Sequence, residues 1–240
     1  MEEKQFKEEL TKRAVQFGVD LSEEQQNQFY QYMQLLIEWN EKMNLTAITE
    51  PQEVLTKHFI DSLSIVPYIT EKEKILDIGT GAGFPGIPLK IVLPQNSFVL
   101  LDSLNKRIHF LQEVIEQLKL EKIEAIHGRA EEFCKEEKRE KYDIVVSRAV
   151  AKLKVLLEYM LPFTRVGGKC ICMKALEIEE ELADAKKAIE ILGGTIEKIE
   201  EITLENTDIK RKIVIIKKTK ETPKKYPRKP GTPNKEPLTK

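Results

Sequence analysis

The chain has 240 residues, 41% hydrophobic and 33% charged, with a formal net charge of −1, so it can form one large domain with an accessory segment. No apolar run approaches the roughly 18 residues of a membrane span, and the N-terminus lacks an apolar signal core, so we expect a cytoplasmic protein without a membrane partner. The three cysteines are too few and too scattered for a disulfide framework or a zinc site, and we expect no metal.

The first 70 residues have helical periodicity. Apolar residues at helical spacing form two runs: Phe6, Leu10, Ala14 and Phe17, and then Phe29, Tyr32, Met33, Leu36, Ile37 and Trp39. Gly18 is expected to end the first helix, and Ser22 to open the second as its N-cap. Further short helices are expected around Pro51 and over 58–63.

From about residue 74, strands alternate with helices. We predict strands at 75–79, 97–102, 122–128, 142–147, 168–174, 195–204 and 211–218, and helices at 86–93, 105–119, 129–138, 152–162 and 177–192. This alternation predicts a mainly parallel sheet covered on both faces. Only residues 205–208 separate the last two strands, so these are expected to form an antiparallel hairpin.

A seven-stranded sheet that ends in such a hairpin is typical of the Rossmann-like class I S-adenosylmethionine-dependent methyltransferase fold, rather than of the six-stranded dehydrogenase type. The predicted organisation is therefore an N-terminal helical region at 1–70, an α/β domain at 71–218 and a C-terminal tail at 219–240.

The loop at 77–86, with the sequence DIGTGAGFPG, connects the first predicted strand to a helix. Glycines such as Gly79 and Gly81 allow a tight turn that approaches a ligand closely. An acid at the strand end, Asp77, is unsuited to a pyrophosphate but suits an ammonium group. S-adenosylmethionine has an ammonium group and no phosphate, so we expect it as the cofactor.

Two alternatives stay open for this loop. Residues 81–86 match the dinucleotide pattern G-x-G-x-x-G literally, although the match begins too late after the strand. The loop can also be a bare tight turn.

Other candidate residues follow the later strands, where doubly wound sheets bind ligands. Asp102 ends the second strand and can accept hydrogen bonds from both ribose hydroxyls, or cap the next helix. Ala130 and Glu131 follow the third strand and can border an adenine ring, although Glu131 also suits the first turn of a helix. Arg148 follows the fourth strand, and it is either a substrate or cofactor clamp or part of a buried ion pair.

The C-terminal tail concentrates positive charge. Residues 217–240 hold nine basic and two acidic residues, which leaves the rest of the chain at −8. The tail also holds five of the eleven prolines, so we expect no packed core or regular helix in it. A mobile basic arm suits RNA, and the candidate contacts are Lys224, Lys225, Tyr226, Arg228 and Lys229, with the tyrosine stacking on a base. Cutting after Lys218 should then leave cofactor binding intact.

Several motifs together resemble the bacterial RsmG (GidB) family. They are the loop at 77–89, WNEKMNLT at 39–46, KHFIDSL at 57–63, DSLNKR at 102–107, RAE at 129–131, SRAVA at 147–151 and YPRKPGTP at 226–233. The resemblance spans nearly the whole chain. It implies methylation of a guanine N7 in the decoding-region loop of 16S ribosomal RNA, as naked RNA or as a precursor of the small subunit. It also implies cofactor contacts at Gly79, Phe84, Ala130, Glu131 and Arg148.

The sequence also lacks residues that other kinds of base methylation need, which agrees with methylation of guanine N7. Guanine N7 has a free lone pair, so its methylation needs alignment and no general base. No cysteine follows the fourth strand, as cytosine-5 methylation would need, and SRAV at 147–150 differs from the Pro-rich loop of many amine methyltransferases. Two rival hypotheses are a small-molecule or protein methyltransferase and an NAD-dependent oxidoreductase.

Overall fold

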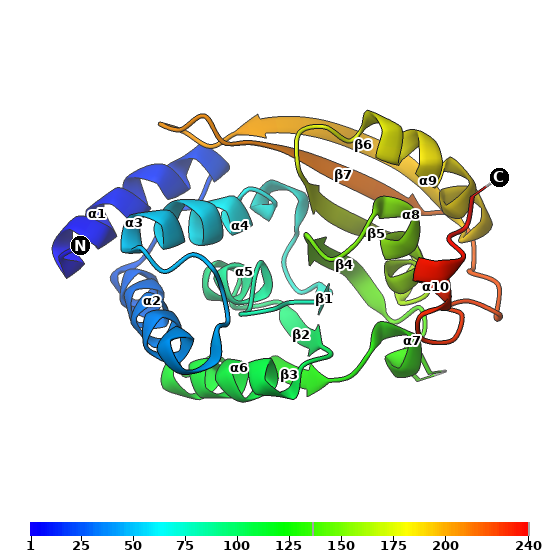
Figure 1. The fold of residues 1–240 in the computed structure, drawn as a ribbon. Coiled ribbons are helices and arrows are strands. Elements are labelled where there is room, and N and C mark those ends of the chain that lie inside the picture. The colour runs from blue at the N-terminus through cyan, green and yellow to red at the C-terminus, as the bar shows by residue number, and fades with distance from the viewer. Residues whose placement is uncertain (136, 240) are drawn as a thin grey trace.

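A seven-stranded mixed sheet forms the centre of the protein, in the order β3-β2-β1-β4-β5-β7-β6 (Figure 1). The computed structural model describes residues 1–135 and 137–239. The strands are β1 (Lys74–Ile78), β2 (Ser97–Asp102), β3 (Ile123–His127), β4 (Tyr142–Arg148), β5 (Thr164–Lys174), β6 (Gly194–Thr203) and β7 (Lys210–Lys218). All seven predicted strands are confirmed, and β5 begins at Thr164, earlier than the predicted start at 168.

The final hairpin is confirmed, and its position in the sheet was not predicted. Strands β1 to β5 pair in parallel, whereas β7 pairs antiparallel with both β5 and β6. The last strand in sequence is therefore inserted between β5 and β6. This leaves β6 at the edge of the sheet, where most of its side chains are exposed.

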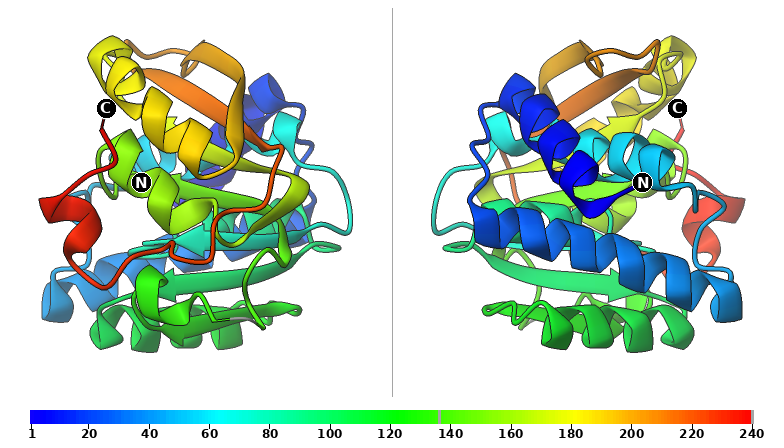
Figure 2. Two further views of the ribbon diagram at one scale, coloured as in Figure 1. Left: turned by 90° about the vertical axis from the view of Figure 1, so that its right-hand side faces the viewer. Right: turned by 90° about the vertical axis from the view of Figure 1, so that its left-hand side faces the viewer.

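Helices cover both faces of the sheet (Figure 2). They are α1 (Glu3–Ala14), α2 (Glu23–Met43), α3 (Pro51–Val54), α4 (Asp61–Leu63), α5 (Gly86–Val92), α6 (Asn105–Gln117), α7 (Ala130–Phe133), α8 (Leu153–Met160), α9 (Glu179–Ile191) and α10 (Thr232–Lys235). Two short 3-10 helices, η1 (Val15–Phe17) and η3 (Val66–Tyr68), and a π-helical segment between α3 and α4, η2 (Leu55–Ile60), complete the set of described helices. Helices α1, α2, α5 and α6 lie on one face, and α8 and α9 on the other.

The N-terminal helices share a core with the glycine loop. Ser22 forms the expected capping box with Gln25, and Gly18 ends the first helical segment in a left-handed conformation, with φ of 72°. Tyr32 of α2 stacks between Phe59 and Phe84, and its ring centroid lies 5.3 Å from that of Phe59 and 5.4 Å from that of Phe84. Because these aromatic rings bury one another, the N-terminal region and the loop stabilise each other.

The helix predicted at 129–138 is too long. Helix α7 spans only Ala130–Phe133, and Cys134 ends it with non-helical dihedral angles. The acidic and basic residues that follow form turns in place of an amphipathic stripe. Glu136 lies outside the described residues.

The prediction that the tail cannot join a core or form a helix is wrong for the described residues. Tyr226 is 6% exposed and packs in the core beneath α8, and Thr232–Lys235 form the short helix α10. The physical reason is that partners elsewhere in the fold compensate the tail's polar groups. Lys240 of this basic segment lies outside the described residues.

Candidate active site

A cavity of about 230 Å³ opens where β1, β2 and β3 end, and we call it the strand-end pocket. Its lining residues are Ile78, Gly79, Leu101, Asp102, Ser103, Gly128, Arg129, Ala130, Glu131, Val150, Tyr159, Gly231 and Asn234. Parallel strands bring their carboxyl ends to one edge, so residues far apart in sequence meet there. Four of the predicted cofactor residues lie in this pocket: Gly79, Asp102, Ala130 and Glu131.

The turn after β1 needs glycine for two separate reasons. Gly79 has a φ of +68°, which is unfavourable for other residues, and a Cβ there would overlap a methyl group of Val150. At Gly86 a Cβ would overlap Leu100, so this glycine lets α5 pack closely on β2. Gly81 also has a positive φ, but a Cβ there would meet open space.

Asp77 is fully buried and holds the loop together. Its Oδ2 accepts hydrogen bonds from Thr80 Oγ1 at 2.7 Å and from the Gly86 backbone N–H at 2.9 Å. Its Oδ1 has no hydrogen-bond partner among the described residues. Burial raises the pKa of this carboxyl group to about 7, although both hydrogen bonds and Arg148 act in the opposite direction.

Replacing Asp77 by asparagine is expected to remove a pH dependence of stability. Because the folded-state pKa is about 7 against an ordinary 3.8, folding strengthens proton binding, and this stabilisation is complete below pH 4 and lost as the pH rises through 7. Relative to the variant, the wild type should lose up to about 4 kcal/mol of unfolding free energy over that window. Urea unfolding from pH 4 to 8 measures the difference, and a difference that stays constant with pH would contradict the assignment.

Asp102 lines the strand-end pocket, and its carboxylate also binds backbone groups of the neighbouring turns. Its Oδ2 accepts from the Gly81 backbone N–H and its Oδ1 from that of Leu104, both at 2.9 Å, and Arg107 Nη1 lies 3.1 Å from Oδ2. The predicted capping role is not present: Leu104 is the N-cap of α6, no side chain among the described residues caps this helix, and Asp102 binds the residue before its first turn. Both carboxylate oxygens thus have partners within the protein, and the Arg107 side chain of this ion pair is one-third exposed.

Ala130 and Glu131 begin α7 at the other end of the strand-end pocket. Oε1 of Glu131 accepts a hydrogen bond of 3.3 Å from the backbone N–H of Gly231, in the C-terminal tail. The carboxylate also lies in the first turn of α7, as the structural alternative predicted. The structure thus links this residue to the tail, a contact that sequence reasoning did not predict.

Arg148 forms the buried ion pair that was one of its two predicted roles. Its Nη1 donates to Asp61 Oδ2 at 3.1 Å and to the Lys57 carbonyl at 2.9 Å, and Nη2 lies 3.0 Å from His58 Nδ1. Its guanidinium also lies over the Phe84 ring, 5.0 Å from the centroid. Burial, followed by the charge of Arg148, lowers the pKa of His58 to about 3, so this imidazole is neutral at physiological pH.

A second cavity of about 690 Å³, the Arg148 pocket, adjoins the first. Its charged lining residues are Lys57, Asp61, Arg148, Lys152, Lys174, Glu181 and Arg211. Val150 lines both cavities, so the two meet at this side chain. Val150 is the one described residue that the two lining sets share.

Four predicted cofactor residues do not line the strand-end pocket. Asp77 and Gly81 support its loop, Arg148 lines the adjoining pocket, and Phe84 is 4% exposed beneath His58, with ring centroids 4.2 Å apart. Their direct contact with a cofactor stays a prediction.

The predicted RNA contacts divide into two groups. Lys224, Lys225 and Lys229 are exposed and stay candidates. Tyr226 is not available as a stacking platform because its ring is buried, and Arg228 is bound to Glu158. The idea of a mobile arm fails for these two residues because the protein itself supplies their partners.

Sequence reasoning missed several residues around the two pockets. Tyr159 and Asn234 line the strand-end pocket, and His58 and Asp61 line the Arg148 pocket, together with the junction residue Val150. His58 and Asp61 lie in the motif at 57–63, which was the only sequence signal for them. Nothing in the local pattern of the tail indicated that Asn234 lines the strand-end pocket.

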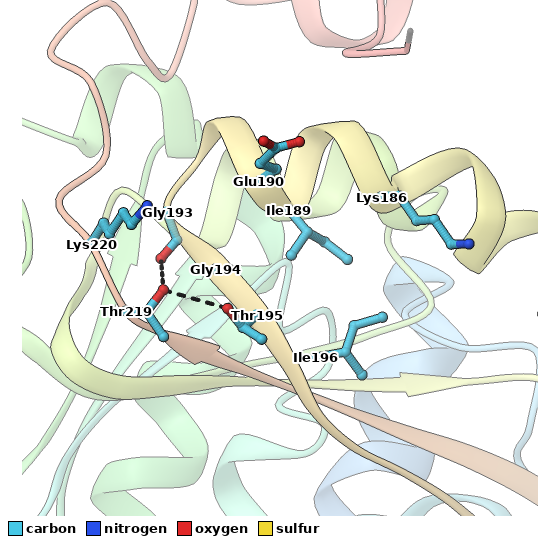
Figure 3. A pocket seen from close by; sticks show the side chains of 9 residues that line it. All are labelled: Lys186, Ile189, Glu190, Gly193, Gly194, Thr195, Ile196, Thr219 and Lys220. Carbon is cyan, nitrogen blue, oxygen red and sulfur yellow. Dashed lines mark hydrogen bonds between the residues drawn. The ribbon is translucent and has the colours of Figure 1, made fainter.

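A third cavity, of about 400 Å³, lies between α9 and β6 (Figure 3). Gly194 starts β6 at the amino ends of the parallel strands, away from the strand-end pocket. This cavity contains none of the predicted site residues. Within 1–135 and 137–239 there is no group of three or more His, Cys, Asp or Glu that could hold a metal ion, and no helix long and apolar enough to cross a membrane.

Comparisons with known proteins agree on family and fold. The GidB family model, described as rRNA small subunit methyltransferase G, matches residues 25–214. Proteins named ribosomal RNA small subunit methyltransferase G from Acetivibrio thermocellus and Clostridium novyi are 55% and 52% identical to this chain, over 100% and 98% of both chains respectively.

Solved structures with low sequence identity share the fold. One is the precorrin-6y C5,15-methyltransferase of Geobacter metallireducens, with a TM-score of 0.50 and 13% identity over 74% of this chain and 92% of that one. Another is Pyrococcus horikoshii TYW2 in complex with MeSAdo, with a TM-score of 0.52 and 12% identity over 65% of this chain and 60% of that one. These likenesses support the class I methyltransferase fold.

Proposed function

The chain belongs to the rRNA small subunit methyltransferase G (GidB) family, and from that premise we propose that it methylates N7 of a guanine in the decoding-region loop of 16S ribosomal RNA. The methyl donor is S-adenosylmethionine, and the protein acts in the cytoplasm, where bacterial ribosomal subunits are assembled. The observation that carries the proposal is the meeting of two pockets at Val150, one at the strand ends and one lined by cations.

The residues of the first pocket and of the loop beneath it fit this cofactor. Asp77 does not line the pocket, but its Oδ1 is buried without a hydrogen-bond partner among the described residues, and we assign it to the ammonium group. Gly79 presents only backbone to the pocket and lets Val150 pack against it, and Asp102 faces the pocket with a carboxylate for ribose hydroxyls. Ala130 and Glu131 border the adenine end. When bound, the cofactor supplies an electrophilic methyl group next to Val150.

The second pocket holds the target guanine. Arg148 presents a planar cation there, fixed in place by Asp61, the Lys57 carbonyl and His58, and we assign it to positioning the base or its phosphate. Lys152 is exposed at the rim, and Lys224, Lys225 and Lys229 add sequence-independent affinity for the RNA backbone.

This chain provides no activated nucleophile among its cysteines, and guanine N7 needs none. Burial raises the pKa of Cys134 to about 11 and that of Cys170 to about 12, so both stay thiols at neutral pH. No observation favours the small-molecule, protein-methyltransferase or oxidoreductase alternatives.

A mapping experiment tests the proposal. The protein is incubated with S-adenosylmethionine and either 16S ribosomal RNA or a subunit precursor, and N7-methylguanosine is located by borohydride reduction and aniline cleavage. One cleavage site in the decoding-region loop is expected, and it should disappear when that guanine is replaced by adenine. The proposal would be refuted if the methyl group were found on another atom, or if neither RNA substrate were methylated.

The rate of methyl transfer is expected to lack an acidic limb near neutrality. N7 has no proton to lose, and the imidazole beside Arg148 has a pKa of about 3 and is already neutral at pH 6. Asp77, whose pKa is about 7, is assigned to cofactor binding and not to the chemical step, so saturation with the cofactor removes its titration from the rate. Single-turnover rates from pH 6 to 9, with both substrates saturating, should vary by less than about threefold, against the tenfold per pH unit of an essential base. A steep fall towards pH 6 with both substrates still bound would show that a base is required.

A further inference from the structure

The C-terminal tail lies across the same face of the molecule as α7 and α8, with α10 beside them (Figures 1 and 2). It returns to this face after β7, which ends on the far side of the sheet from β3. Its course therefore brings residues near 230 to residues near 130. Three sets of contacts hold it there.

The first contact is a buried ion pair. Glu158 of α8 is fully buried, and its two oxygens accept from Arg228 Nε at 2.9 Å and from Arg228 Nη2 at 2.7 Å. Glu158 Oε1 also accepts from the Arg228 backbone N–H at 2.9 Å. Such a forked pair fixes both the side chain and the main chain of the tail at this point.

The second contact is a clamp of main-chain carbonyls. Arg139 donates to the carbonyls of Tyr226 and Thr222, both at 2.6 Å, and Glu140 accepts from the Thr222 backbone N–H at 2.8 Å. The turns after α7 thus bind the start of the tail. Tyr226 completes this anchor by packing into the core.

The third contact reaches the strand-end pocket. Gly231 and Asn234 line it together with Asp102, Ala130 and Glu131, and Gly231 is hydrogen-bonded to Glu131. Tyr159, next to the anchor residue Glu158, lines it as well. The tail therefore closes the side of the pocket that Glu131 borders.

We propose that the C-terminal tail is part of the cofactor site: Gly231 and Asn234 form its outer wall, and the Asn234 side chain contacts the nucleoside part of the cofactor. This inference rests on the proposed function, which places S-adenosylmethionine in the strand-end pocket. The primary amide of Asn234 offers both a donor and an acceptor, the combination that the edge of an adenine ring presents in return. The proposal contradicts the sequence-based expectation that cutting the chain after Lys218 leaves cofactor binding intact.

The test compares Asn234→Ala with Lys235→Ala by calorimetry, using S-adenosylmethionine and S-adenosylhomocysteine as ligands. Both residues are exposed on α10, but only Asn234 lines the pocket, so both variants should fold. We expect Asn234→Ala to bind both ligands about five- to tenfold more weakly, the loss of one hydrogen bond, and Lys235→Ala to bind like the wild type. If the two variants bound the ligands with equal affinity, the proposed contact between Asn234 and the cofactor would be wrong.

Limited trypsin digestion of the wild type tests the wall independently. Lys225, Arg228 and Lys235 are tryptic sites in the tail, and a saturating cofactor is expected to slow cleavage there at least severalfold. If the cofactor left the rate of cleavage at these sites unchanged, the proposal that the tail forms a wall of the cofactor site would be wrong. Failure of the wild type to bind S-adenosylmethionine at all would instead refute the proposed function, so the two failures are distinguishable.

Discussion

Replacing Gly79 by valine is expected to weaken cofactor binding at least about 100-fold, or about 2.7 kcal/mol. The backbone at Gly79 has a φ of +68°, and a Cβ there would overlap a methyl group of Val150. The added side chain must therefore either enter the strand-end pocket or push Val150 away from the junction of the two pockets. Overpacking and the left-handed backbone each cost about 1–3 kcal/mol. Calorimetry with S-adenosylmethionine on the folded variant measures the loss.

Gly18→Val is the matched control. Gly18 also has a positive φ, of +72°, but a Cβ there would meet no atom within 4 Å, and it lies at the end of the first helical segment. The control should lose stability without losing cofactor affinity. Adding Val150→Ala to Gly79→Val should restore part of the affinity, because it removes the overlapping methyl groups. If Gly79→Val bound the cofactor with wild-type affinity, the placement of the cofactor against this loop would be wrong.

Arg228→Ala is expected to destabilise the protein by about 3–5 kcal/mol. The substitution removes the guanidinium from the buried Glu158 carboxylate, and among the described residues only the backbone N–H of residue 228 still donates to it. Removing one partner of a buried pair costs far more than the pair itself contributes, because the remaining charge is not solvated. Urea unfolding at pH 7 gives the difference in unfolding free energy.

Two further variants separate charge from side-chain loss. Lys229→Ala removes an exposed neighbouring cation and should change stability by no more than about 0.5 kcal/mol. Glu158→Gln combined with Arg228→Ala should recover part of the loss, since an amide is less costly to bury than a carboxylate. A loss in Arg228→Ala no larger than that in Lys229→Ala would show that the tail is not anchored by this pair.

The strand pattern, the glycine loop and the capping of α2 could all be predicted from the sequence. Each depends on residues close together in the chain: apolar runs bounded by breakers for strands, Ser22 three residues before Gln25 for the cap, and glycines in the turn after Asp77. The strand-end acids could be predicted as well, because parallel strands always bring their carboxyl ends together. Asp102 lies in the strand-end pocket for that reason. All the assigned cofactor contacts stay predictions, both those inside this pocket and those of Asp77, Gly81, Phe84 and Arg148 outside it.

The tail shows where local pattern misleads. Its composition of prolines and lysines is typical of a disordered segment, because such residues cannot bury one another. Its partners are Glu158, Arg139 and Glu131, which lie between 70 and 100 residues earlier in the chain. Composition describes what a segment can do alone, and this segment is stabilised by groups that it does not contain.

By itself, then, the sequence determined the fold class, the loop after β1 and, through its motifs, the family, because these depend on short-range spacing. Only the tertiary structure decided the insertion of β7 between β5 and β6, the pairing of Arg148 with Asp61, and the place of Val150 between two pockets. It also brought Asn234 to the site. The physical reason is that burial and charge compensation depend on which distant segments come into contact, and those contacts form only when the whole sheet and its covering helices are assembled.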